Sequence, residues 1–329
     1  ARRSLANAGI VEKDIWVCWT LLRLQTIPDT PHLVFKGGTS LSKCFGLIYR
    51  FSEDIDLGIE REDIAGLADV QEARCLMGKL DPASGTSRKA YERAVEAMKL
   101  RVQGYIAEDL FPLIEANFSE ALGEEFALHL PATSTEEPTI LFEYPRALSA
   151  ETYGARDYVQ SAVKLELGAR SDHEPVRTVA IRPYAATEFE SEFKQPACNV
   201  VAQAPERTLL EKALILHAAI HKGRIKGQSS RHAYDLAMMH RDAGTMAVVT
   251  RELYERVAFH KFVYGESTAV RDAPKNGIRL VPEGDVLREL EADYGRMESM
   301  FFTEPAAPTF AEVLAELREL ESALNVLKA

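Results

Sequence analysis

The sequence FKGGTSLSK at residues 35–43, followed by RFSEDIDL at residues 50–57, decides how this chain is expected to fold. A short strand is predicted at 32–36, because an apolar run there is ended by a pair of glycines. A short helix is predicted at 39–45. Residues 51–59 alternate between apolar and polar side chains, which predicts a second strand. The stretch therefore predicts a strand, a glycine turn, a helix and another strand in close succession.

The second strand carries the candidate metal ligands. Alternation places Asp54 and Asp56 on one face, with Ser52 beside them. Neighbouring carboxylates repel each other, and a divalent cation such as Mg²⁺ removes that cost. The two glycines allow backbone N–H groups to approach a phosphate closely. A glycine turn or an Asp-x-Asp edge alone is common in proteins without such a site, but together they favour metal-assisted phosphoryl or nucleotidyl transfer.

A third carboxylate is predicted on a later strand. In the sequence VKLEL at 163–167, Lys164 and Glu166 face one side and the apolar residues face the other. Glu166 is therefore a candidate to complete the metal site or to act as a base on the attacking hydroxyl. The alternative is a solvated strand face on which Glu166 pairs with Lys164.

Two helices carry charged residues at apolar positions. The helix predicted at 205–221 is apolar nearly all round, so it should be buried, and Lys212 within it needs an anionic partner such as a triphosphate. The alternative is a lysine that extends past the core to water. In the next helix, Asp235 lies beside two methionines. The alternative for Asp235 is an i, i+4 ion pair with Arg231.

The segment between Glu211 and Asp235 contains no acidic residue. Four cations in it are candidate contacts to RNA or phosphate: Lys222, Arg224, Lys226 and Arg231. The alternative is a solvated basic loop.

These motifs resemble the AbiEii/AbiGii-type nucleotidyltransferase toxins of type IV toxin–antitoxin pairs, within the DNA polymerase β-like nucleotidyltransferase superfamily. The stretches at 35–43 and 50–57 carry the resemblance, together with RTLLEK at 207–212 and RHAYDL at 231–236. The resemblance implies that Asp54 and Asp56 bind Mg²⁺, two ions in all, and that both are catalytic with Lys212 and Asp235. The nucleotide-binding residues would then be Gly37, Gly38, Thr39, Ser40, Lys43, Ser52 and Lys212.

The function implied by the resemblance is transfer of a nucleoside monophosphate from a nucleoside triphosphate (NTP) to an acceptor hydroxyl. An RNA acceptor is implied, the 3′ end of a tRNA in particular. So are a role in phage defence and a partner that is an antitoxin protein or a kinase. Phosphorylation of Ser52 would repel the neighbouring carboxylates and inactivate the protein. The alternatives are transfer to a small molecule or a protein hydroxyl, and a non-catalytic nucleotide-binding module of the same fold.

The predicted fold class is α+β. A polymerase β-like nucleotidyltransferase domain with a mixed sheet is expected at 1–200, with an insertion at 61–136. A helical domain at 201–329 would contribute Lys212 and Asp235. The other predicted helices are 11–26, 86–120, 205–221, 229–242, 245–260, 283–299 and 309–328. The other predicted strands are 125–130, 139–144, 158–167 and 176–183.

Composition limits the classes of protein that remain. The 329 residues carry a net charge of −11, which argues against a general nucleic-acid coat and restricts RNA contact to a local basic patch. Four cysteines without a CxxC pair fit a reducing compartment. The longest early apolar run is too short to span a bilayer, so we expect a cytoplasmic protein.

Overall fold

The computed structural model describes residues 8–28, 30, 32–59, 87–131, 138–149, 161–168, 172–195, 197–225, 227–301 and 305–327. Lys226 and parts of the predicted insertion at 61–136 therefore lie outside the described residues.

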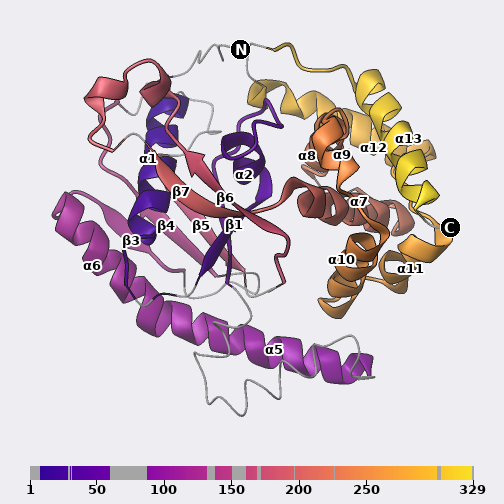
Figure 1. Cartoon of the computed structure of the whole chain (residues 1–329), viewed down its shortest axis with the longest axis horizontal. Coiled ribbons are helices and arrows are strands. Elements are labelled where there is room, and N and C mark those ends of the chain that lie inside the picture. The colour runs from indigo at the N-terminus through magenta and orange to yellow at the C-terminus, as the bar shows by residue number, and fades with distance from the viewer. Residues whose placement is uncertain are drawn as a thin grey trace.

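A seven-stranded mixed sheet forms the centre of the first two thirds of the chain, in the order β3-β4-β5-β2-β1-β7-β6 (Figure 1). Strand β2 runs antiparallel to β1 and parallel to β5, and β1 runs parallel to β7. The strands are β1 (Leu33–Lys36), β2 (Ile55–Ile59), β3 (Ala127–His129), β4 (Thr139–Glu143), β5 (Val163–Gly168), β6 (Val176–Ile181) and β7 (Cys198–Gln203).

Helices cover the sheet and then form the rest of the chain. Helix α1 lies across the sheet, α5 and α6 run along one side of it, and α7 to α13 gather beside it (Figure 1). The early helices are α1 (Ala8–Leu24), α2 (Gly37–Lys43), α5 (Arg88–Tyr105), the π-helical turn η2 (Ile106–Leu110) and α6 (Phe111–Leu122). The later ones are α7 (Pro205–His221), α8 (Ser230–His240), α9 (Ala243–Ala247), α10 (Arg251–Val263), α11 (Thr268–Asn276), α12 (Gly284–Gly295) and α13 (Phe310–Val326). Short 3₁₀ turns lie at Ala185–Thr187, Glu190–Glu192 and Arg296–Met300.

The apolar side chains form two clusters. In the first, Phe35, Ile55 and Leu57 pack against α1 on one face of the sheet. The alternating residues of β1 and β2, including Lys36 and Asp56, therefore point to the opposite face. The second cluster lies among α7 to α13 and also takes in Leu41 and Ile48. Buried apolar residues up to Val200 belong mainly to the first cluster and those from Leu209 onward mainly to the second, with Val263 of α10 an exception that joins the first. The division into domains at residue 200 stays a prediction.

The α+β class, the mixed sheet and the helical C-terminal part are confirmed. The predicted strand at 51–59 was wrong in its first half, because β2 begins at Ile55 and the preceding residues form no ladder. Strand β7 was missed altogether. The predicted helix at 245–260 was also wrong, because it is two helices, α9 and α10, each begun by a side-chain cap, Asp242 and Thr250.

Among the described residues, no helix is both long enough and apolar enough to cross a membrane.

Candidate active site

Asp56 lies at the centre of a row of polar side chains that crosses the sheet. Its register partner on β1 is Lys36 and its partner on β5 is Glu166. Register partners in neighbouring strands point to the same face. The structure therefore brings Asp56 and the predicted third carboxylate together, with Lys36 on the other side. Asp54 directly precedes β2, so Asp54, Asp56 and Glu166, which we call the carboxylate row, lie close together.

The carboxylate row is electrostatically unfavourable without a cation. Burial raises the pKa of Asp54, and repulsion from Glu166 raises it further. Burial also raises the pKa of Asp56 to about 7; the charge of Lys36 opposes this effect, while Glu166 and Asp54 add to it. A set of close carboxylate oxygens whose ionised forms repel each other suits a hard divalent cation such as Mg²⁺. These three residues would hold the metal.

The glycine turn at Gly37 and Gly38 lies in close contact with Asp56 of the carboxylate row. Gly37 has φ +78°, and a Cβ atom there would overlap Oδ2 of Asp56. A Cβ atom at Gly38 would lie 2.7 Å from Ser52 Oγ and 2.9 Å from Arg50 Nη2. Only glycine fits both positions without displacing these side chains. The backbone N–H groups that open α2 therefore lie next to Asp56 and Ser52, where a phosphate could approach them.

The hydroxyl groups of the turn are buried and already bonded. Thr39 Oγ1 donates to Ser52 Oγ at 3.0 Å, and Ser40 Oγ donates to the carbonyl oxygen of Gly37 at 3.2 Å. Thr39 is 2% exposed and Ser40 is fully buried. These bonds hold the shape of the turn, and its backbone is what remains available to a ligand.

Lys43 is engaged elsewhere. Its ammonium pairs with Asp14 at 2.7 Å, donates to the carbonyl oxygen of Arg182 at 2.7 Å and lies 3.7 Å from the ring centre of Tyr184. The ion pair with Asp14 outweighs burial and raises the pKa of Lys43 above its usual range. A nucleotide-binding role would require Lys43 to exchange one of these partners for phosphate.

Asp235 is fully buried and holds two cations. Arg50 donates to both of its oxygens, Nε at 2.7 Å and Nη2 at 2.8 Å, and Lys212 Nζ lies 2.9 Å from Oδ2. Although burial alone would raise it, these two charges hold the pKa of Asp235 well below its usual range. The ion pair with Arg231 considered from the sequence is not formed; the described contact of Arg231 is with Gln228. Asp235 therefore positions Arg50 and Lys212.

Lys212 links this buried pair to the carboxylate row. Lys212 is 8% exposed, and its charge is one of those that lower the pKa of Asp56. It therefore does not extend freely into water, and it has found a carboxylate partner within the protein. Glu166, in turn, forms an ion pair with Lys164, the alternative considered from the sequence, and it also lies opposite Asp56; its role at a metal or as a base stays a prediction.

The basic segment faces acidic neighbours. Lys222 pairs with Glu266 at 3.1 Å, and the backbone of Ile225 donates to Glu289 on α12. Arg224 is exposed, and Lys226 lies outside the described residues. Arg231 differs from the others because its charge lowers the pKa of Asp54. Of the predicted phosphate contacts in this segment, Arg231 is the one that the structure brings near the carboxylate row.

Sequence reasoning missed three cations of the site. Arg50 holds Asp235, Lys36 lies beside Asp56, and Lys13 on α1 is 2% exposed and pairs with Glu53 at 2.5 Å. The charge of Lys13 also acts on Asp54. The signal was available for Lys13, because a lysine on the apolar face of a predicted helix needs a buried anion. For Arg50 the partner is 185 residues away, and no local pattern indicates it.

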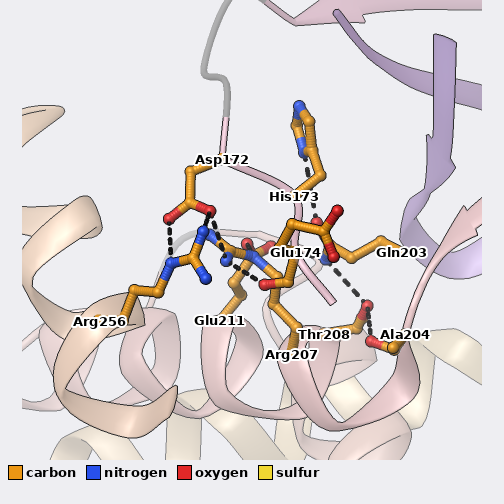
Figure 2. A network of polar contacts seen from close by, with 9 residues as sticks. All are labelled: Asp172, His173, Glu174, Gln203, Ala204, Arg207, Thr208, Glu211 and Arg256. Atoms are coloured by element: carbon orange, nitrogen blue, oxygen red, sulfur yellow. Dashed lines mark hydrogen bonds and ion pairs between the residues drawn. The ribbon is translucent and has the colours of Figure 1, made fainter. Parts of the chain in front are cut away.

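A second polar network fixes the start of α7 (Figure 2). Arg207 is fully buried and donates to Glu211 at 3.1 Å and to the carbonyl oxygen of Glu174 at 2.6 Å. It also pairs with Asp172 at 3.3 Å, and Asp172 pairs with Arg256. We call Asp172, Arg207, Glu211 and Arg256 the α7 clamp.

Gln203 connects the α7 clamp to the sheet (Figure 2). Its Nε2 donates to Thr208 Oγ1 at 3.0 Å and to Glu211 Oε2 at 3.2 Å, and its Oε1 lies 3.4 Å from Nδ1 of His173. Gln203 follows Ala202, the register partner of Phe35, so it stands beside Lys36 at the end of the polar row. The α7 clamp therefore sets where Lys212 stands relative to Asp56.

Residues 19–316 match the sequence model of a family described as nucleotidyl transferase AbiEii toxin, type IV toxin–antitoxin system. None of the curated proteins matches the chain. Among solved structures, the nucleotidyltransferase toxin MenT4 of Mycobacterium tuberculosis matches with 17% identity and a TM-score of 0.48, covering 100% of this chain and 98% of that one. A TM-score this low carries no argument about this chain.

Proposed function

This chain belongs to the AbiEii family of nucleotidyl transferase toxins of type IV toxin–antitoxin systems, and from that membership we propose an Mg²⁺-dependent transfer of nucleoside monophosphate from an NTP to an RNA hydroxyl. The family membership indicates a nucleotidyltransferase with an antitoxin partner. The metal, the RNA acceptor and the roles of single residues are parts of the proposal.

The observation that carries the proposal is the contact between the glycine turn and the carboxylate row. A phosphate bound at the N–H groups of the turn would lie against Asp56, because Gly37 leaves no room between them. Asp54, Asp56 and Glu166 would hold Mg²⁺, which when bound neutralises the charge that develops on the phosphoryl oxygens. Arrangements of this kind support phosphoryl chemistry by positioning and by charge stabilisation.

In the proposed reaction the oxygen of the acceptor hydroxyl forms a bond to the α-phosphorus of the NTP. The bond from that phosphorus to the bridging oxygen breaks, and pyrophosphate leaves with the electron pair. The proton of the hydroxyl passes to Glu166 or to water. Lys212, held in place by Asp235, would stabilise the negative charge of the triphosphate.

The acceptor is proposed to be RNA, with the 3′ end of a tRNA as the specific case. Arg231 supports this proposal, since it is the cation at the start of α8 whose charge reaches Asp54. A polyanionic acceptor is attracted by cations near the reacting atoms. Lys222, which pairs with Glu266, would contribute at the edge of such a contact.

The test is transfer of label from each α-³²P-labelled NTP in the presence of Mg²⁺ and total cellular RNA. Label entering RNA, and no label entering RNA with Asp56→Asn, would support both the reaction and the acceptor. Asp285→Asn is the matched control, because Asp285 is an exposed aspartate on α12 paired only with neighbouring Arg288. Label on a protein or small molecule would show that the acceptor is not RNA. Absence of transfer to any acceptor would favour a non-catalytic nucleotide-binding module.

A further inference from the structure

Each described lysine around the carboxylate row except Lys36 has a carboxylate partner. The pairs are Lys13 with Glu53, Lys43 with Asp14, Lys164 with Glu166 and Lys212 with Asp235. Within the described part of the chain, the ammonium of Lys36 forms no ion pair and no hydrogen bond. It is the exception at the centre of the site.

Lys36 is nevertheless surrounded by polar groups. It ends β1 immediately before Gly37, and its register partner is Asp56. Its charge lowers the pKa of Asp56 more than any other cation does, and it also acts on Glu211 and His173. The ammonium therefore lies between the carboxylate row and the α7 clamp, close to both and bonded to neither.

Among the described residues, none of the groups near Lys36 is its hydrogen-bond or ion-pair partner. Glu211 already accepts hydrogen bonds from Arg207 and Gln203. His173 offers no negative charge, and because burial lowers its pKa to about 3 the ring is neutral; its Nδ1 lies 3.4 Å from Gln203, and its Nε2 has no hydrogen-bond partner among the described residues. Asp56 has one oxygen directed at Gly37 and is part of the proposed metal site. A half-buried ammonium that has lost hydration without gaining an anion is unfavourable.

We propose that Lys36 is a substrate-contacting residue whose ammonium binds a phosphoryl oxygen of the nucleoside triphosphate beside Asp56. The inference rests on the proposed function and adds a residue to it. Lys212 is fixed by Asp235 and contributes from α7, whereas Lys36 contributes from the sheet and exchanges water for phosphate when the nucleotide arrives. The two lysines approach Asp56 from different elements and divide the charge of the triphosphate between them.

The test is binding of a non-hydrolysable α,β-methylene NTP in the presence of Mg²⁺, measured by calorimetry on the full chain. Loss of a hydrogen bond to a charged group predicts that Lys36→Met raises the dissociation constant about ten- to one-hundredfold. Lys36→Arg keeps the charge and should recover part of the affinity. Lys275→Met, at an exposed lysine on α11, is the matched control and should bind like the wild type.

A second readout separates substrate contact from a structural role. Lys36→Met should raise KM for the NTP and leave KM for the RNA acceptor unchanged, with a melting temperature no lower than that of the wild type. Lys36→Gln replaces it if the Met variant does not fold. Unchanged nucleotide affinity in a folded variant would overturn the role of Lys36 alone. Absence of nucleotide binding by the wild type would overturn the proposed function, and the role of Lys36 with it.

Discussion

The carboxylate row and the α7 clamp are two groups of acidic side chains partly or fully withdrawn from water, and they differ in how their charge is balanced. In the α7 clamp, Asp172 meets Arg207 and Arg256, and Glu211 is acted on by the charges of Lys261 and Arg207. The pKa of each carboxylate lies below its usual value although burial opposes this. In the carboxylate row, Asp54 and Asp56 lie next to other carboxylates and the pKa of each lies above its usual value.

The difference separates carboxylates whose negative charge is balanced by cations of the protein from carboxylates whose charge would be balanced by a bound ligand. A buried anion surrounded by arginines needs nothing further and stabilises the fold. A buried anion surrounded by anions is a liability to the fold, and it is explained by a cation that arrives later. The balance of charge, rather than burial or acidity, distinguishes the carboxylates of the α7 clamp from those proposed to bind the metal.

The strongest way to break this comparison is Asp56→Asn. We expect a loss of nucleotidyl transfer of about a hundred- to a thousandfold, since removal of a preorganised electrostatic group at a reacting centre costs about 3–4 kcal/mol. We expect no loss of stability in the metal-free protein, because the variant removes a repelled charge. Label transfer and thermal unfolding measure the two effects, and a markedly less stable variant would contradict the comparison.

The α7 clamp should respond in the opposite sense. Arg207→Met should lower the free energy of unfolding by about 3–5 kcal/mol, because it leaves Glu211 and Asp172 with less compensation in the interior. Urea unfolding measures the loss. Arg288→Met, at an exposed arginine on α12, is the control and should change stability by no more than about 0.5 kcal/mol. Equal stability of the two variants would remove the distinction.

The pH dependence of stability sharpens the comparison. Asp56 has a folded pKa of about 7 against 3.8 for the free side chain, so its contribution is fully present below about pH 3.8 and is lost as pH rises toward 7. Carboxylates of the α7 clamp have lowered pKa values. Their contribution to the free energy of unfolding is therefore present above about pH 4 and is lost as the pH falls below that value. The contribution of the α7 clamp therefore changes below about pH 4, whereas that of Asp56 changes in the opposite sense between about pH 4 and 7.

The measurement is the difference in unfolding free energy between metal-free Asp56→Asn and wild type across that range. We expect the variant to gain about 1–2 kcal/mol relative to wild type from pH 4 to 7, less than the full shift implies because Asp56 is partly exposed. Saturating Mg²⁺ should abolish this pH-dependent gain. If the difference in unfolding free energy between the variant and the wild type does not vary with pH, the ionised form of Asp56 is not destabilised by its neighbours.

The smallest expected effect concerns an exposed pair outside both groups. Lys222→Met breaks the contact with Glu266 and should change stability by less than about 1 kcal/mol. If the predicted RNA contact exists, KM for RNA rises and the salt dependence of binding falls by about one ion. Arg224→Met should behave similarly, because Arg224 is exposed in the same segment. If neither KM for RNA nor the salt dependence of binding changes, these two residues do not contact RNA, and phosphate contact would be limited to residues near the carboxylate row.

Local sequence patterns predicted the parts of the fold whose cause is local. The glycine turn, the aspartates of 50–57 and the buried helix α7 follow from backbone requirements and periodicity. Glu166 was predicted on the correct face because alternation in a strand fixes it. Strand β7 was missed because its sequence lacks a clear alternation of apolar and polar residues, with Val201 exposed and Gln203 buried.

The contacts that determine the site are nonlocal. Arg50 and Asp235 are brought together across 185 residues, and Lys36 meets Asp56 through the register of two strands. A helical position such as that of Lys212 reveals that a buried cation needs a partner, and it does not reveal which one. The folded structure therefore adds the identity of the residue with which each buried charge pairs.

The contact of Asp235 with both Arg50 and Lys212 bears on how the toxin is made in the cell. A ribosome produces Asp54 and Asp56 early, but the side chain that aligns Lys212 is added some 180 residues later. A chain that ends before Asp235 would carry the proposed metal ligands without the side chain that holds Lys212 in place. If the proposed roles hold, the site is complete only after most of the polypeptide has been synthesised.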